Sequence, residues 1–373
     1  MKIKHQHIFK ELRRAITDGE YKEGQRLPSE AELVERFATS RPTVARALRE
    51  LQHLGLIERR AGSGTYVRRA AGARPDLFGL LIPGLGETEI FEPICREMSR
   101  FSQTTNHALL WGDTTDEAYT KEEQAEQLCQ QYIARKVSGV FFAPLELTPN
   151  KDAVNQRIVD ALERAHIPIV LLDRCLYEYP RRSRFDLVGI DNRRAGYVVT
   201  QHLLNLGCRR IAFFARPRSA ETVANRINGY RDALAGHGIT PDPAWICYGD
   251  PSDPECVKQI MAQIGAEAFV CANDITAANL MHTFDQLGIR IPLDVRIVGI
   301  DDVKYAKLLR VPLTTLHQPC RHIGAAAVRA MMERIACPDM PARTILLDCK
   351  LIVRESCGAT LNPAPEKLGA GFN

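Results

Sequence analysis

Apolar positions near the start of the chain recur at helical spacing. Ile8, Leu12 and Ile16 lie four residues apart, so they predict an amphipathic first helix. Ser29 followed by Glu32 has the spacing of a capping box, in which each residue satisfies a free backbone donor of the other. A second helix is therefore predicted to begin directly after Ser29.

A third helix and a hairpin follow within the first 68 residues. Ser40 is placed to cap the third helix, whose buried face would carry Val44, Ala47, Leu48 and Leu51. Short segments at 56–60 and 65–67 flank Ala-Gly-Ser-Gly, which is typical of a hairpin turn. The predicted order is three helices and then two strands.

After residue 76 the pattern changes to short apolar runs separated by helical stretches. The runs are 77–82, 108–111, 139–143, 169–172, 187–190, 211–215, 245–248, 268–271, 296–300 and 314–317. Repeated strand and helix predict a parallel sheet covered on both faces. Because about ten strands exceed what one small compact sheet holds, we expect two αβ lobes.

Domain boundaries follow from these changes of pattern. We predict a first domain at 1–68, a linker at 69–75, a second domain at 76–357 and a disordered tail at 358–373. The linker is small, charged and Pro-containing, and the tail is rich in Pro and Gly.

The formal charge of +4 is unevenly distributed. Residues 1–75 contain 16 Lys and Arg against 9 Asp and Glu, whereas the remainder is slightly acidic. A basic first domain favours a polyanionic partner for it, with a solvated basic face as the alternative. No 18-residue apolar run and no apolar signal-peptide core are present, so we expect a cytoplasmic protein without a membrane partner.

The start of the third helix has the composition of a DNA-reading element. Arg41 and Thr43 lie in its first turn, and Arg46 lies about one turn later. Arginine reads guanine through two parallel hydrogen bonds, and helix N-termini attract phosphate. This segment therefore predicts direct contact with double-stranded DNA.

The first domain resembles the GntR-family winged helix-turn-helix. The resemblance rests on LPSEAEL, SRPTVARALREL and GLIERRAGSGTYV, in that order, over residues 4–68. It implies operator contacts by Lys4, Glu30, Ser40, Arg41, Thr43 and Gly62. Ala45 and Ala61 depart from the family pattern, so base specificity does not carry over.

Several polar residues lie at the ends of predicted strands of the second domain. Asp173, Asn273 and Asp301 each end an apolar run, and Arg226 lies on a predicted helix. The carboxyl ends of parallel strands converge, so these groups predict a cleft that binds a polar ligand. Asp274 directly precedes a helix and is interpreted as its cap.

The second domain resembles the two-lobed effector domain of LacI/GalR repressors and type I periplasmic sugar-binding proteins. The markers are IPIVLLDR, VGIDNRRAG, LGCRRIAFF, the helix around Arg226, VGIDD and PLTTLHQP. The resemblance implies sugar contacts by Asp173, Arg226, Asn273 and Asp301. It places Phe91 beside the cleft and Gln318 at the crossover back to the first lobe.

The combination of both domains is similar to the arabinose-repressor type of regulator. It implies a homodimer on a palindromic operator, released by a monosaccharide. An activator, or a regulator that responds to a purine-like ligand, is the alternative. We expect no enzyme, cofactor or metal site, because the sequence contains no GxSxG, HExxH or phosphate-binding loop, and its eleven cysteines are scattered.

Overall fold

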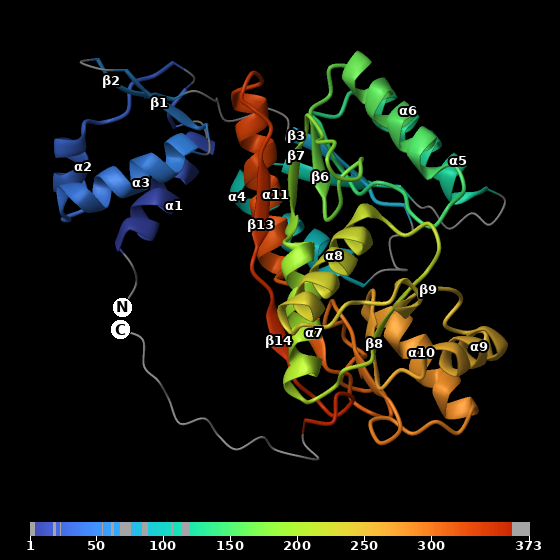
Figure 1. Ribbon diagram of the computed structural model, residues 1–373. Helices are drawn as coiled ribbons and strands as arrows, with labels where there is room; N and C mark the ends of the chain where they lie inside the picture. Colours follow the sequence, from blue (N-terminus) through green and yellow to red (C-terminus); the bar gives the residue numbers. More distant parts are fainter. Residues whose placement is uncertain are drawn as a thin grey trace.

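The computed structural model describes most of the chain (Figure 1). The described residues are 4–17, 20–22, 24–53, 55–60, 63–67, 76–83, 89–105, 107–112 and 119–359. The predicted linker at 69–75 and most of the predicted tail, residues 360–373, lie outside them. None of the described helices is both long and apolar enough to cross a lipid bilayer.

Three helices and one hairpin form the N-terminal domain, in the predicted order. They are α1 (Lys4–Thr17), α2 (Glu30–Arg36), α3 (Arg41–His53), β1 (Ile57–Arg60) and β2 (Gly64–Val67). The two strands pair antiparallel, with Ile57 opposite Val67. Leu33, Val44 and Leu48 are fully buried between the helices. Burial of this apolar face holds α3 in place and leaves its other face to solvent.

The start of α2 confirms the capping box. The Ser29 hydroxyl accepts from the Glu32 backbone N–H at 3.3 Å, and the Glu32 carboxylate accepts from the Ser29 N–H at 2.6 Å. Two free donors of the first turn are thereby satisfied, which fixes the start of α2 relative to α3.

The first lobe of the C-terminal domain is a six-stranded parallel sheet in the order β13-β7-β6-β5-β3-β4. Its strands are β3 (Asp76–Leu81), β4 (His107–Trp111), β5 (Gly139–Phe142), β6 (Ile169–Leu172), β7 (Asp186–Ile190) and β13 (Thr344–Leu347). The helices are α4 (Phe91–Thr105), α5 (Lys121–Ala134), α6 (Lys151–Arg164) and α11 (Cys320–Ala336). Side chains of α4 and α11 pack on one face of the sheet, and those of α5 and α6 pack on the other.

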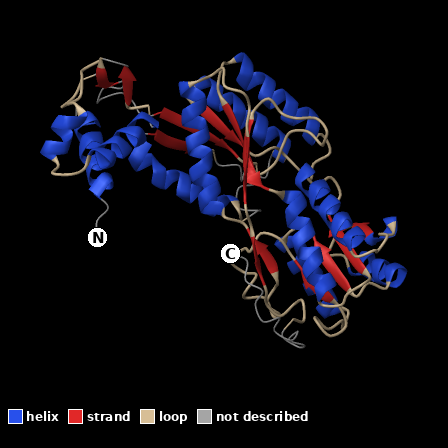
Figure 2. Cartoon of the chain, turned by 60° about the vertical axis from the view of Figure 1, so that its left-hand side comes forward, coloured by secondary structure: helices blue, strands red, loops and turns tan. Residues whose placement is uncertain are grey.

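The second lobe is a four-stranded parallel sheet in the order β11-β10-β8-β9. Its strands are β8 (Ile211–Ala215), β9 (Ile246–Tyr248), β10 (Ala268–Cys271) and β11 (Arg296–Val298). The helices are α7 (Asn192–Asn205), α8 (Glu221–Gly236), α9 (Pro254–Ile264) and α10 (Asp274–Gln286), with a short 3-10 turn η1 (Pro243–Trp245). Figure 2 shows the two sheets as separate layers, each with helices on both sides.

The two lobes are joined by the chain itself. It crosses after β7, returns after β12 (Thr315–His317), and crosses once more between β13 and β14 (Lys350–Ile352), which pairs antiparallel with β12. The predicted two-lobed α/β architecture is confirmed. The sequence patterns missed β13 and β14, because β13 is an edge strand whose residues alternate between exposed and half-buried, and β14 has only three residues.

Close contact between α7 and α8 depends on two glycines. A Cβ at Gly196 of α7 would overlap the Arg226 carbonyl oxygen, and a Cβ at Gly229 of α8 would overlap the Arg193 carbonyl oxygen. Each helix therefore approaches the backbone of the other directly. This contact sets the position of Arg226 on α8.

We predict that Gly229→Ala destabilises the protein, by roughly 1–3 kcal/mol, because the new methyl group meets backbone atoms that cannot rotate away. Gly236→Ala on the same helix is the matched control, since a methyl group there would meet no neighbouring side chain or strand within 4 Å. It is expected to be neutral, or stabilising by about 0.4–1 kcal/mol. Chemical denaturation measures both, and equal effects would contradict the close-contact argument.

Candidate functional site

The first turn of α3 presents its polar side chains to solvent. The Arg41 side chain is 75% exposed, and the hydroxyls of Ser40 and Thr43 lie 2.7 Å apart. The opposite face of α3 is buried through Val44 and Leu48. The sequence therefore places apolar and polar groups on opposite sides of one helix, which is the arrangement that the predicted recognition helix needs.

Glu30 connects α2, α3 and the hairpin. Its carboxylate accepts from the Arg59 guanidinium on β1 and lies 3.6 Å from Nε of Arg41. Arg59 was not among the predicted residues, because only the folded hairpin brings it to α2. Arg46 lies one turn farther along α3, with a 64% exposed side chain whose Nε is 3.5 Å from the Glu50 carboxylate.

Two predicted DNA contacts cannot be placed. Lys4 is the first residue of α1, and its side chain lies outside the described residues. Gly62 lies outside them altogether. Glu30, Ser40, Arg41 and Thr43 gather at the start of α3, and a DNA role for the whole predicted set stays a prediction.

Two predicted acids lie where the lobes meet, each at the end of a strand. Asp173 follows β6 of the first lobe with φ 68°, and Asp301 follows β11 of the second lobe with φ 138°. Asp301 reaches the guanidinium of Arg226, with a distance of 3.8 Å between Oδ1 and Nη2. Uncommon backbone angles of this kind are concentrated at functional sites.

Arg226 is almost fully buried and held from two directions. Its Nε donates to the Asn192 side-chain oxygen at 2.8 Å, and its Nη1 donates to the Ala272 carbonyl. Only 4% of the Arg226 side chain is exposed. The guanidinium is thus fixed before any ligand arrives, which lowers the entropic cost of binding.

The structure corrects the assignment of the α10 cap. Asn273, not Asp274, is the N-cap: its Oδ1 accepts from the Thr276 N–H at 3.0 Å. Asn273 has extended backbone angles that allow this contact, whereas Asp274 is already helical. The Asp274 carboxylate instead accepts from the Thr315 hydroxyl at 2.6 Å and the Val303 N–H at 3.1 Å.

Gln318 and Phe91 each contact one of the buried charged groups where the lobes meet. Gln318 is fully buried, and its Nε2 donates to Asp301 Oδ1 at 2.7 Å. Phe91 is buried at the start of α4, with the Arg174 guanidinium carbon 5.6 Å from its ring centroid. Phe91 therefore supports Arg174 through a cation–π contact.

The buried polar groups where the lobes meet, among them Asp173, Arg226 and Asp301, form a charged cluster. Arg174, Glu146 and Glu221 also belong to it, and the sequence analysis did not predict them. Arg174 is 6% exposed, pairs with Glu146, and has its Nε 3.6 Å from Asp173. Glu146 also accepts from the Ala220 N–H at 3.1 Å, and Glu221 accepts from the Cys175 N–H at 2.8 Å. The last two bonds join the lobes. The position of Arg174 directly after Asp173 was the one signal that could have found it.

Three polar atoms of the cluster are buried without a hydrogen-bond partner among the described residues. They are Asp173 Oδ1, Arg174 Nε and Gln318 Oε1. An unpaired buried polar atom costs about 1–3 kcal/mol, so folded proteins rarely leave several together. One donor and two acceptors are thus available to a ligand between the lobes.

Burial and neighbouring groups together shift the pKa values of the carboxyl groups in different directions. Burial raises the pKa of Asp173 against the opposing pull of Arg174 and Arg226, and it raises the pKa of Asp301 to about 8. Burial also raises the pKa of Glu221. For Glu146, burial acts in the same direction but Arg174 outweighs it together with other donors, so the pKa is lowered.

Comparison with known families agrees with this fold. Residues 4–67 match the family described as bacterial regulatory proteins, gntR family, and residues 200–357 match the periplasmic binding protein-like domain. The repressor PurR of Aliivibrio fischeri is 30% identical over 63% of this chain and 68% of that protein. The chain is a LacI/GalR-type transcriptional regulator with a GntR-family DNA-binding domain.

Other relatives of this regulator cover different shares of its length. PurR of Photobacterium profundum is 32% identical over 54% of this chain, and the alignment spans only 61% of that protein. The arabinose metabolism transcriptional repressor of Geobacillus stearothermophilus is 26% identical over 89% of this chain and 91% of that protein. The solved complex of the transcriptional regulator CelR with cellobiose has a TM-score of 0.65, 22% identity, and covers 88% of this chain and 100% of its own.

The predicted effector-binding residues are divided by the boundary of the family match. Arg226, Asn273, Asp301 and Gln318 lie inside the periplasmic-binding-protein-like match, whereas Asp173 lies before it. Asp173 reaches the same place from the first lobe, because it follows the parallel strand β6. The cluster is therefore assembled from both lobes of the regulator.

We predict that Asp301→Asn stabilises the ligand-free regulator, and increasingly so as the pH rises from 5 to 8. The folded state raises the pKa of Asp301, so it holds a proton that the unfolded state has released, and stability falls with pH across this window. At pH 8 we expect the Tm of Asp301→Asn to exceed that of wild type by on the order of 2–4 °C, which corresponds to about 1 kcal/mol.

Thermal unfolding between pH 5 and 8 measures that gap. The control is Asp339→Asn, which changes an exposed carboxyl group. Its Tm should differ from that of wild type by the same amount at every pH. A lower Tm for Asp301→Asn at pH 8 would contradict the prediction, since the attraction to Arg226 would then outweigh the cost of burial.

Proposed function

We propose that the regulator is a cytoplasmic repressor that binds a palindromic operator as a homodimer and releases it when a small sugar binds to the predicted cleft, at the buried charged groups between the lobes. The observation that carries this proposal is the set of unpaired buried atoms on Asp173, Arg174 and Gln318. Sugar hydroxyls each donate and accept, so adjacent hydroxyls fit such a mixed set.

The charge pattern of the cleft favours a polyol. Carboxylates accept from two neighbouring hydroxyls and guanidinium groups donate two parallel hydrogen bonds, which gives affinity and orientation together. Among the described residues, Asp173, Asp301, Glu146 and Glu221 face only two guanidinium groups, those of Arg174 and Arg226. Because burial raises the pKa of Asp173, Glu221 and Asp301, these carboxyl groups can donate as well as accept hydrogen bonds, as neighbouring sugar hydroxyls do. The arabinose repressor and the cellobiose complex among the relatives support a sugar.

The same residues connect binding to movement of the lobes. Asp173 and Arg174 belong to the first lobe, whereas Arg226 and Asp301 belong to the second. Gln318 lies on the crossover after β12, where it contacts Asp301. A ligand that contacts both sides binds one lobe arrangement more tightly and shifts the population toward it. Coupling to DNA of about 1–3 kcal/mol would be typical.

No catalytic role is part of this proposal. The carboxyl groups are paired with guanidinium and amide groups that bind and orient, and the relatives are transcription regulators. A homodimer is proposed because one recognition helix makes few base contacts, and two helices on a palindrome double the interface.

We predict that Arg41→Ala reduces affinity for the operator by at least about fivefold, because one bidentate base contact is worth about 1–3 kcal/mol. Fluorescence anisotropy with a duplex selected from random sequence by the wild-type protein measures this. Arg329→Ala removes an exposed arginine from α11 of the body and should leave operator affinity unchanged. Equal affinity of Arg41→Ala and wild type would contradict the assignment of α3.

The same anisotropy assay tests the effector class. Saturating arabinose, ribose, xylose, glucose or galactose should release the operator from wild type if one of them is the ligand. Release by adenine, guanine or hypoxanthine, with no response to any sugar, would contradict the polyol proposal and favour the purine-like alternative.

A further inference from the structure

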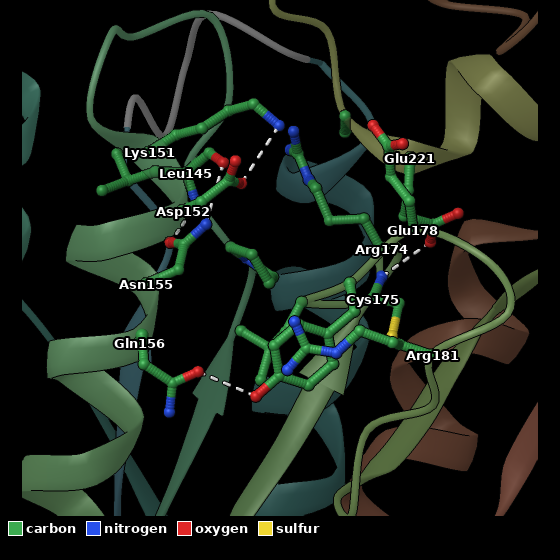
Figure 3. A pocket seen from close by; sticks show the side chains of 14 residues that line it. Leu145, Lys151, Asp152, Asn155, Gln156, Arg174, Cys175, Glu178, Arg181 and Glu221 are labelled. Carbon is green, nitrogen blue, oxygen red and sulfur yellow. Dashed lines mark hydrogen bonds and ion pairs between the residues drawn. The ribbon is translucent and has the colours of Figure 1, made fainter.

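The two ends of α6 differ in the charge around them. Its first residues, Lys151 and Asp152, line a chamber of about 320 Å³ between the lobes (Figure 3). The chamber wall is balanced, with three bases and three acids: Lys151, Arg174, Arg181, Asp152, Glu178 and Glu221. The far end of α6 lies at the other edge of the first lobe, where basic side chains predominate.

These basic side chains lie where three strands of the first lobe begin. Arg135 and Lys136 precede β5, Arg164 precedes β6, and Arg184 precedes β7. The three strands are neighbours in the sheet and run parallel. Because parallel strands begin at the same edge of a sheet, the segments before them lie side by side. We call Arg135, Lys136, Arg164 and Arg184 the basic edge.

Most of the charge on the basic edge is uncompensated. All four side chains are exposed. Glu163 forms an ion pair with Arg184. In the part of the chain that the structure describes, no carboxylate forms an ion pair with Arg135, Lys136 or Arg164. Three cations are therefore available to a partner.

The composition of the surrounding body does not account for this edge. Residues 76–373 are slightly acidic as a whole. Asp186 also lies at the start of β7, but it is fully buried and paired with Arg334 and Arg343. Helix C-termini favour nearby cations, which applies to the residues after α5 and α6 but not to Arg184. The edge thus gathers positive charge on a body that otherwise lacks it.

A groove beside the basic edge adds further hydrogen-bond donors. It has a volume of about 630 Å³, lies between α5 and α6, and includes Arg164. Its other polar residues are mostly glutamines and one arginine: Gln127, Gln130, Gln131, Arg157 and Glu126. The carboxylate of Glu126 accepts from Arg157 Nε at 2.6 Å, so its charge is already matched. Arginine and glutamine side chains are common donors to the phosphate oxygens of DNA.

The chain holds the DNA-binding domain close to the basic edge. The Ser138 N–H donates to the Leu77 carbonyl at 2.8 Å, so the start of β3 lies directly beside the start of β5. Residues 68–76 lead from the end of β2 to the start of β3, and nine residues span at most roughly 30 Å. Figure 1 shows the N-terminal domain beside the first lobe. This reach corresponds to roughly nine base pairs, at about 3.4 Å each.

We propose that the basic edge is a second DNA contact of the regulator, which binds backbone phosphates of the duplex that flanks the operator and reads no bases. The tether favours DNA over an acidic protein, because the DNA-binding domain carries a duplex within reach of this edge. The inference goes beyond the proposed contacts of α3, and it rests on DNA binding by the N-terminal domain.

The dependence of affinity on duplex length tests the inference. Full-length wild type is titrated with the operator duplex that it selects from random sequence, and with the same duplex extended by about ten base pairs on each side. Fluorescence anisotropy should show at least about tenfold tighter binding of the extended duplex at 0.1 M salt, for any flanking sequence. This comparison uses wild type alone, so it does not depend on the folding of a variant.

An edge variant locates the contact. Its three substitutions are Arg135→Gln, Lys136→Gln and Arg164→Gln. It should lose the gain from the flanks and bind the short duplex within about twofold of wild type. The slope of log affinity against log salt for the extended duplex should become shallower by about 2–3, since each phosphate contact contributes about 0.9.

A control variant removes the same charge from exposed positions of the second lobe. Its substitutions are Arg209→Gln, Arg231→Gln and Lys258→Gln. It should keep both the gain from the flanks and the salt slope of wild type. Equal losses in the edge and control variants would show an effect of net charge alone and overturn the inference.

Two further results would contradict the second contact. Equal affinity of wild type for the short and extended duplexes refutes it and leaves operator recognition by α3 standing. An edge variant with the flank gain and salt slope of wild type also refutes it, and assigns the charge to another partner such as an acidic protein. Failure of wild type to select any duplex refutes both this inference and the proposed function.

Discussion

The structure depends on a buried set of guanidinium and carboxyl groups where the two lobes meet. Arg174 pairs with Glu146 and approaches Asp173 from the first lobe, and Arg226 approaches Asp301 in the second. Buried ion pairs rarely add stability over apolar residues of the same shape, because desolvation consumes the attraction. Their retention here, with several polar atoms left unpaired, is explained best by a ligand that completes them.

Backbone packing holds these charges in place. Gly196 and Gly229 let α7 and α8 touch backbone to backbone, and this contact carries Arg226 to the carboxyl ends of β10 and β11. The bonds from Glu146 to Ala220 and from Glu221 to Cys175 then join the lobes directly. A ligand that changes either arrangement would change how the lobes meet, and we propose this as the physical route from the charged cluster to the DNA-binding domain.

Much of this arrangement was predictable, and what was missed has physical causes. Alternating strand and helix predicts convergent strand ends, so Asp173 and Asp301 could be placed together from the sequence. The contacts of Glu146 and Glu221 reach across to the other lobe, and no local pattern encodes that approach. The cap of α10 depends on the backbone angles of Asn273, which sequence position alone does not distinguish from those of Asp274. Strand β13 was missed for a similar reason, because its partner β7 lies about 150 residues earlier in the chain.

The central claim is that the Arg226 guanidinium transmits sugar binding to the DNA-binding domain. The most direct measurement is operator affinity with and without saturating sugar, for Arg226→Lys beside Arg231→Lys at an exposed position on the same helix. Lysine keeps the charge but lacks the planar fork of donors. We predict that Arg226→Lys binds the operator normally and no longer responds to sugar, whereas Arg231→Lys responds as wild type does. A full response in Arg226→Lys would contradict the account.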